Sequence, residues 1–150
     1  SPVIWYPSSL SIAAGRAGGE GRGKHIFPVK SLLQAGALVI YGSDWPSVSH
    51  EPSPWPGMEA MVTRRNPYTN TGEQFWPEQA IALWQAIQIF TRNGAIAMKK
   101  GDVSGSIEVG KYADFIVLDR NIFDIPITEL SEIKVLWTVF EGQVTASPEQ

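Results

Sequence analysis

The chain has 150 residues, with 12 Lys or Arg against 15 Asp or Glu, and a formal net charge of −3 at pH 7. This mildly acidic balance, without a basic tract, gives nucleic-acid binding no electrostatic basis. Cysteine is absent, which excludes disulfides and thiolate metal sites. No apolar run approaches the roughly 20 residues that span a bilayer, and a complete eight-stranded β/α-barrel needs about 250 residues. We expect a soluble, cytoplasmic protein without nucleic-acid or membrane partners.

The first segments of the chain indicate an α/β arrangement. Residues 3–6 are expected to form a short strand, and residues 8–24, rich in Gly, Ser and Arg, a loop. A helix follows, with Pro28 in its first turn and Gly36 after its end. It leads into the fully apolar run Ala37-Leu38-Val39-Ile40-Tyr41, which is typical of a buried parallel strand. Helix and strand together predict one αβ step.

The segment after this predicted strand, Gly42-Ser43-Asp44-Trp45-Pro46, is the most informative in the chain. In β/α-barrels the carboxyl ends of the strands face the active site, so Asp44 is predicted to lie where such barrels carry out chemistry. Gly42 permits close backbone approach, and Pro46 keeps Trp45 out of helical geometry. A carboxylate in that position binds a metal ion or transfers protons. The alternative is that Asp44 only caps a turn.

The middle of the chain predicts loops and helices. Residues 45–57 contain four prolines and are expected to form a stiff loop, followed by a short helix at 57–64 and another loop at 66–77. From Leu83, apolar residues recur at i, i+4 and i+7, which indicates an amphipathic helix. Residues 91–93 are expected to break this helix before a second short one.

The character of the sequence changes at about Gly101, where short β-type segments with turn residues begin. These segments cover residues 106–108, 114–118 and 135–140, and a tight turn at Glu141-Gly142 returns the chain into residues 143–145. We therefore expect an α/β part at residues 1–100, as a remnant of a β/α-barrel, and a small β part at residues 101–150.

Several of these segments resemble the amidohydrolase superfamily. Gly42-Ser43-Asp44-Trp45-Pro46, followed by Val62-Thr63-Arg64, is similar to its last barrel strand and the loop after it. Thr91-Arg92-Asn93-Gly94-Ala95 resembles the helix after the barrel. Residues 105–119 resemble the return into the β-sandwich domain, and residues 135–142 its final hairpin. The motifs follow in order along nearly the whole chain and most resemble the branch that contains N-substituted formamide deformylase.

The resemblance implies a metal-dependent hydrolase that cleaves carbon–nitrogen bonds other than peptide bonds, in small amide-type substrates such as formamides. It implies the last αβ units of a β/α-barrel at 1–100 and part of a small β-sandwich domain at 101–150. The family holds one or two divalent metal ions, often zinc, with a His-x-His pair, a Lys or other bridging group, two further His and an Asp. Asp44 matches that Asp, which makes it both metal ligand and proton shuttle.

The remaining metal ligands of the family have no counterpart in this sequence. It contains no His-x-His pair, and its only histidines are His25 and His50, whereas a catalytic zinc usually has three protein ligands and a water. The chain also begins without an initiator Met or a signal-peptide pattern. We therefore expect the carboxyl-terminal portion of a longer enzyme, with no metal bound stably by this chain alone.

Three further residues are candidates for substrate binding. Trp45 would line a pocket for an apolar group, or else pack in the core. His50 would contact substrate or metal from the proline-rich loop, or else be a solvated loop residue. Arg64 would bind a carboxylate with two parallel hydrogen bonds, or else be a charged helix end favoured by the helix dipole.

A non-catalytic module is the alternative function. In the family, strands from the amino-terminal end complete the β-sandwich, so residues 114–118 or 135–140 would here be left with an unpaired edge. Unpaired edges recruit other chains, and we expect self-association through these strands.

Overall fold

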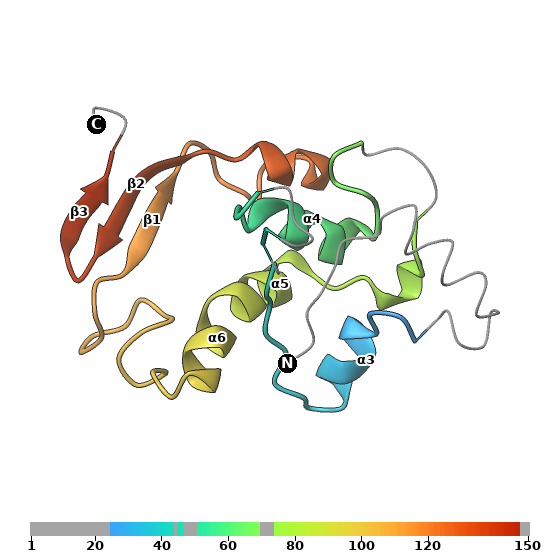
Figure 1. The fold of residues 1–150 in the computed structure, drawn as a ribbon, viewed down its shortest axis with the longest axis horizontal. Coiled ribbons are helices and arrows are strands. Elements are labelled where there is room, and N and C mark those ends of the chain that lie inside the picture. The colour runs from blue at the N-terminus through green and yellow to red at the C-terminus, as the bar shows by residue number, and fades with distance from the viewer. Residues whose placement is uncertain (1–24, 44, 47–50, 70–73, 148–150) are drawn as a thin grey trace.

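The computed structural model describes residues 25–43, 45–46, 51–69 and 74–147 of the 150-residue chain. Its helices form one body, and a small antiparallel sheet lies at one end (Figure 1). The elements are α3 (Val29–Gln34), α4 (Trp55–Thr63), the 3₁₀ helix η1 (Pro77–Gln79), α5 (Leu83–Phe90), α6 (Arg92–Ala97), β1 (Phe115–Leu118), the 3₁₀ helix η2 (Ile127–Glu132), β2 (Val135–Phe140) and β3 (Gln143–Ala146). The strand expected at 3–6 and the loop at 8–24 lie outside the described residues.

Helix α3 matches the expected helix. Pro28 occupies its N-cap, and Gly36 follows its end with a φ of +77°, a conformation that glycine adopts without steric cost. The backbone N–H groups of Gly36 and Ala37 donate to the carbonyls of Leu33 and Leu32. These hydrogen bonds satisfy carbonyls that the end of a helix otherwise leaves unpaired.

The apolar run at 37–41 differs from expectation. It is not helical, but within the described part of the chain no strand pairs with it, so it forms no sheet. A parallel strand needs a neighbouring strand to accept and donate its backbone hydrogen bonds. The expected burial is also met only in part, since Val39 is buried but Leu38 is 48% exposed. Strand pairing depends on a neighbour that the described residues do not supply.

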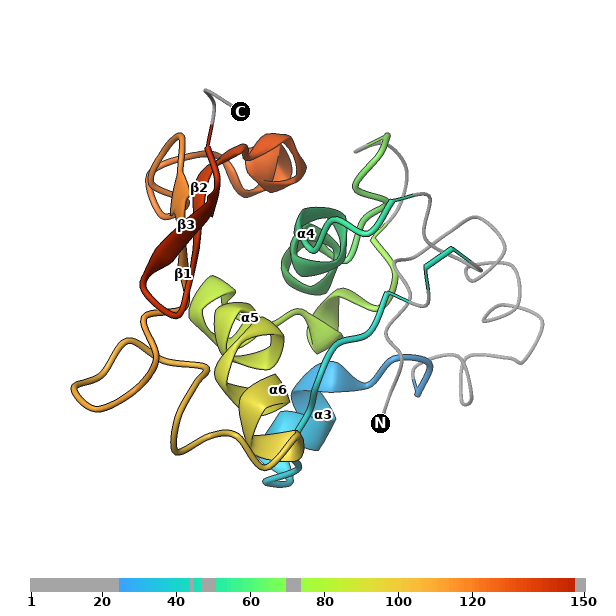
Figure 2. The ribbon, with the colours of Figure 1, turned by 60° about the vertical axis from the view of Figure 1, so that its left-hand side comes forward.

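Helix α4 begins at Trp55, two residues earlier than expected. Pro54 is its N-cap and Pro56 lies in its first turn, where a missing N–H costs nothing because those groups have no partner within the helix. All of its residues except Val62 are buried. It packs between η2 and α5 (Figure 2), so it forms the centre of the helical body.

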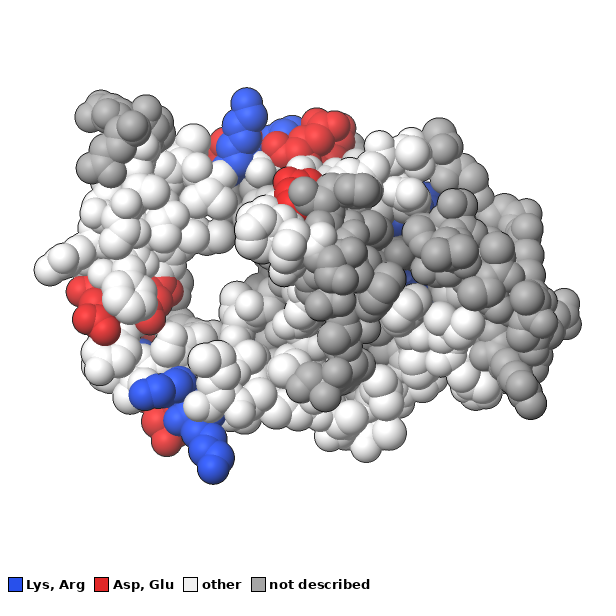
Figure 3. Space-filling model, viewed as in Figure 1, with Lys and Arg blue, Asp and Glu red and all other residues white. Residues whose placement is uncertain are grey.

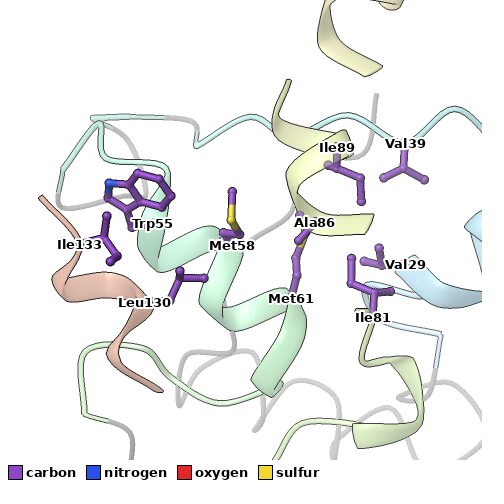
Figure 4. Packing of buried hydrophobic residues seen from close by; sticks show 10 residues of the cluster. All are labelled: Val29, Val39, Trp55, Met58, Met61, Ile81, Ala86, Ile89, Leu130 and Ile133. Carbon is purple, nitrogen blue, oxygen red and sulfur yellow. The ribbon is translucent and has the colours of Figure 1, made fainter. Parts of the chain in front are cut away.

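The hydrophobic core is built around α4. Leu130 and Ile133 from the η2 region lie against Trp55 and Met58, and Met61 faces the opposite group (Figure 4). That opposite group combines residues of α3, the 37–41 run and α5 with Ile81. The full cluster is Val29, Val39, Trp55, Met58, Met61, Ile81, Ala86, Ile89, Leu130 and Ile133. Residues near 130 thus complete the core that the residues before 100 begin.

The sheet has the order β1-β2-β3 with both pairs antiparallel. Phe115 lies opposite Val139, which in turn lies opposite Val144. The β2–β3 turn is formed by Glu141 and Gly142, both with positive φ, as a two-residue hairpin turn requires, and the predicted hairpin is confirmed. The 106–108 segment is not a strand and belongs to a loop.

Both faces of the sheet present apolar side chains to solvent. Neighbouring residues on a strand point to opposite faces, and Phe115 and Ile116 are both exposed, as are Trp137 and Phe140 on β2. Among the residues described, no helix combines the length and apolar character needed to cross a membrane.

Candidate functional site

Asp44 and His50, two of the four residues predicted for the site, lie outside the described residues. The structure describes the chain on both sides of Asp44, however. Ser43 is half-buried and Trp45 is exposed, and the hydroxyl of Ser43 accepts a hydrogen bond from the Trp45 backbone N–H at 3.3 Å. The contacts that hold residues 37–43 therefore set the backbone that precedes Asp44.

Three contacts hold that run in place. The Nδ2 of Asn93, on α6, donates a hydrogen bond to the backbone carbonyl of Val39 at 2.9 Å. The ring of Tyr41 stacks on Phe90 of α5, with 4.1 Å between ring centroids and 23° between planes. The same side chain lies against Gly57 of α4, where a Cβ would be 2.6 Å from Tyr41 Cε2. Three helices thus position the backbone that leads into Asp44.

Trp45 is 54% exposed. Within the described residues Trp45 therefore does not pack in the core, whereas Trp55 does. An exposed indole next to the predicted carboxylate leaves apolar surface free for contact with another group.

Arg64 is only 2% exposed and follows the last residue of α4 in the left-handed conformation, with a φ of 57°. Its Nε donates to the carbonyl of Phe75 at 2.8 Å, and its Nη1 donates to the carbonyl of Phe27 at 3.4 Å. Its guanidinium carbon also lies 5.7 Å from the centre of the Phe75 ring. The side chain therefore connects the end of α4 to two loops.

The third nitrogen of Arg64 differs from the other two. Nη2 is buried and has no hydrogen-bond partner among the described residues. Burial lowers the pKa of the Arg64 guanidinium to about 10, and the negative charge of Glu78 opposes this effect. The guanidinium remains charged at neutral pH, so the two N–H groups of Nη2 have no acceptor among the described residues.

Two polar residues that connect distant segments were missed by the sequence analysis. Glu59, on α4, is fully buried, and its Oε2 accepts a hydrogen bond from the backbone N–H of Ser131 at 2.7 Å. This bond fixes η2 against α4. Asn93 is the other, through its hydrogen bond to Val39. The sequence signal for Glu59 was its position as a single carboxylate within the apolar stretch from Met58 to Val62. For Asn93 the only signal was the family motif in which it lies.

A metal site is not formed within the described part of the chain, where no three His, Cys, Asp or Glu side chains come together. The histidine described there, His25, is exposed. The donor set of this part therefore does not fit a catalytic metal ion by itself, since such an ion usually has three protein ligands.

A groove of about 1000 Å³ separates the sheet from the helical body, and the opening is visible in Figure 3. It is lined by residues of α5, α6, β1, β2 and the loop between α6 and β1, and its apolar side chains include Phe90, Met98, Phe115 and Phe140. Asp114 lies at its wall, and its two oxygens accept hydrogen bonds from Ser104 Oγ and the Glu141 N–H.

Comparison with known sequences identifies relatives. The model of a family described as the amidohydrolase family matches residues 1–146. The chain is 38% identical over 117 residues to N-substituted formamide deformylase of Arthrobacter pascens, which covers 78% of this chain and 21% of that protein. It is 31% identical over 127 residues to the putative amidohydrolase YtcJ of Bacillus subtilis, covering 84% of this chain and 23% of that one. The chain thus spans less than a quarter of the length of these relatives.

Solved structures with the same fold include an uncharacterised metal-dependent hydrolase from Pyrococcus horikoshii, at a TM-score of 0.63 and 24% identity over 79% of this chain and 24% of that one. An adenosine deaminase from Xanthomonas campestris with bound zinc gives a TM-score of 0.63 at 18% identity, covering 94% of this chain and 35% of that one. The family match and the sequence relatives confirm the resemblance drawn from the motifs: the chain belongs to the amidohydrolase superfamily, in its amidohydrolase 3 branch.

Proposed function

We propose that this chain is the carboxyl-terminal part of a metal-dependent hydrolase that acts on carbon–nitrogen bonds other than peptide bonds, such as those of amides or formamides. The observation that carries the proposal is the family match over residues 1–146 together with the 38% identity to a formamide deformylase. The substrate would be a small molecule.

The proposed architecture assigns residues 1–100 to the last αβ units of the β/α-barrel and residues 101–150 to part of a β-sandwich. Helix α3 followed by the apolar run at 37–41, whose Val39 packs in the core, supports the first assignment. The small antiparallel sheet with apolar side chains on both faces supports the second.

Asp44 is the proposed metal ligand and proton shuttle. The described residues do not supply the rest of a ligand set, so the remaining ligands would come from outside this chain. A divalent ion, zinc in the simplest case, lowers the pKa of a bound water to about 7 when it is present. The carboxylate of Asp44 would take a proton from the attacking water and return it to the amine nitrogen as that nitrogen leaves.

Trp45, His50 and Arg64 are the proposed substrate contacts. The exposed indole of Trp45 offers apolar surface beside Asp44 in the sequence. For Arg64, a substrate contact would be made through Nη2, since Nε and Nη1 already donate to backbone carbonyls.

The test is an Asp44→Asn substitution in a longer protein that contains this chain, assayed with a simple N-substituted formamide. Loss of a general acid–base group is expected to lower kcat by about 100-fold or more. Asp102→Asn is the matched control, because Asp102 is an exposed loop residue with the same chemistry, and it should leave kcat unchanged. An unchanged rate in Asp44→Asn would remove Asp44 from the mechanism.

Self-association through the β-strands is the second candidate function, with no catalysis by the chain. Of the two segments expected to leave an edge unpaired, 135–140 does not, because β2 is the central strand and pairs on both sides. The proposal is favoured by the outer strands β1 and β3, each of which pairs on one side only within the described residues. Chain mass measured by light scattering during size-exclusion chromatography tests it. A dimer or larger species supports the proposal and a clean monomer contradicts it.

A further inference from the structure

The run at 37–43 leads directly into Asp44, and the question is what holds the backbone of this run in one conformation. No strand pairs with it within the described part of the chain, yet Val39 is only 1% exposed and packs in the core beside Ile89 (Figure 4). Apolar packing restrains the side chain but does not satisfy the backbone carbonyl, and buried carbonyls are nearly always hydrogen-bonded.

Asn93 supplies that missing hydrogen bond. Its Nδ2 lies 2.9 Å from the carbonyl oxygen of Val39, which is 54 residues away in the sequence and part-buried. A side-chain amide is a neutral donor, so it pairs with a carbonyl without bringing a charge into the core. The bond takes the place of one that a neighbouring strand would make.

The break between α5 and α6 is what directs Asn93 to this position. Thr91 leaves helical geometry, with φ −123° and ψ −89°, and its Oγ1 donates to the carbonyl of Ile87 at 2.7 Å. A new helix then begins at Arg92, which puts Asn93 in its first turn. The same pair of helices contributes Phe90, on which Tyr41 stacks, so α5 and α6 together hold the run at Val39 and at Tyr41.

We propose that Asn93 is a positioning residue for the reaction: its hydrogen bond to Val39 fixes the backbone that presents Asp44. The catalytic consequence rests on the proposed function, whereas the ordering of residues 38–43 does not. Asp44 follows Val39 by five residues, and displacement of a catalytic group by about 1 Å costs up to about 100-fold in rate.

The first experiment measures order in the 150-residue chain itself. Asn93→Asp keeps the shape of the side chain and removes its N–H donor, while Asn93→Ala removes the side chain. We expect ¹⁵N order parameters at residues 38–43 to fall from about 0.85 to below about 0.6 in both variants. The control is Asn121→Ala, because Asn121 also donates through Nδ2, to Asp124 at 2.7 Å in an exposed loop. Unchanged order in both Asn93 variants, or the same loss in the control, overturns the inference.

A measurement on the unsubstituted chain decides the question if both Asn93 variants unfold. A scalar coupling across the hydrogen bond, between ¹⁵Nδ2 of Asn93 and the ¹³C carbonyl of Val39, is expected. Its absence, with the side-chain amide exchanging as fast as that of a solvated Asn, means that the bond does not persist in solution and overturns the inference.

The second experiment measures catalysis in a longer protein that contains this chain. Asn93→Asp is expected to lower kcat by about 10-fold to 100-fold with KM changed less than about twofold, at a melting temperature that shows the protein to be folded. A residue with only a structural role would lower the folded fraction and leave kcat per folded molecule unchanged, and that result contradicts the positioning role. If the unsubstituted longer protein does not hydrolyse the formamide, the proposed function fails, and the order parameters alone decide whether Asn93 positions the run.

Discussion

At the scale of single residues, Arg64 shows how one side chain can hold several segments together. The guanidinium of Arg64 joins the end of α4 to the carbonyls of Phe27 and Phe75, and the Arg64 carbonyl accepts the N–H of Phe75 at 2.7 Å. Burial of the charge is unfavourable, as the lowered pKa indicates, and the hydrogen bonds offset that cost. The main role of Arg64 is therefore in folding, and Nη2 is the nitrogen that remains for a substrate contact.

Arg64→Leu is expected to destabilise the chain by about 3 kcal/mol, because it leaves two carbonyls without their charged donor. Arg64→Lys should recover part of this loss, since an ammonium group reaches only one of the two carbonyls. Urea denaturation measures both variants. Arg92→Leu, at an exposed position on α6, is the control and should change stability by less than about 0.5 kcal/mol.

The two roles of Arg64 predict different kinetics. If Arg64 mainly binds substrate, the leucine variant keeps its stability and raises KM in the longer protein. That result would contradict the structural role drawn from its burial.

Glu108 gives a prediction that depends on pH. Its Oε1 accepts a hydrogen bond from Ser106 Oγ at 2.6 Å and lies 3.5 Å from Lys111 Nζ. The hydrogen bond from Ser106, followed by the charge of Lys111, holds the pKa of Glu108 below its ordinary value of 4.5. A lowered pKa in the folded state means that the ionised carboxylate favours folding at pH above 4.5. This contribution is lost as the pH falls through the lowered value.

An NMR titration of the Glu108 side-chain carboxyl measures this shift. Ser106→Ala should move the midpoint back towards 4.5, because it removes the largest cause of the shift. Ser31→Ala, in α3, is the control and should leave the midpoint unchanged. A midpoint in the unsubstituted chain at or above 4.5 would show that the loop does not hold this hydrogen bond in solution.

At the scale of elements, local signals predicted those structures that depend on a few neighbouring residues. The end of α3 at Gly36 and the β2–β3 turn at Glu141-Gly142 follow from backbone conformations that these residues favour. The break at Thr91 was also predicted. A strand was predicted at 37–41, but the structure has no sheet there, because pairing depends on a distant neighbour. The early start of α4 was missed because prolines are compatible with a first helical turn.

Two glycines at equivalent positions of α4 and α6 give opposite predictions. Gly57 and Gly94 are each the third residue of their helix. A Cβ on Gly57 would overlap the Tyr41 ring, while a Cβ on Gly94 would have nothing within 4 Å. Gly94→Ala should stabilise the chain by about 0.5–1 kcal/mol through helix propensity.

Gly57→Ala gains the same propensity but must displace Tyr41, and overpacking of this kind costs about 1–3 kcal/mol. We therefore expect it to be destabilising in thermal and urea denaturation. A stabilised Gly57→Ala would mean that Tyr41 does not pack against α4 in solution, and that the run leading into Asp44 is held in another way.

At the scale of the whole molecule, contacts between segments far apart in the chain could not be predicted from the sequence. The family was predictable because its motifs are short and occur in order. The burial of Arg64 was not, since it depends on where the loops at 27 and 75 pass. The contribution of Leu130 to the core of the helical body was likewise not predicted, because a 3₁₀ helix of six residues has little periodicity.

The outer strand β3 gives the last prediction. Its four residues, Gln143–Ala146, are uncharged and exposed, and charged edge residues are what normally prevents strands of two molecules from pairing. Pairing of β3 with β3 of a second copy would be antiparallel and symmetric, a contact that joins two copies. Val144→Lys should therefore shift the mass measured by light scattering from dimer to monomer. Met98→Lys adds the same charge at an exposed apolar site on the groove next to α6 and should leave the dimer intact. Dissociation by Met98→Lys alone would show that copies meet across the groove, with the sheet edge uninvolved.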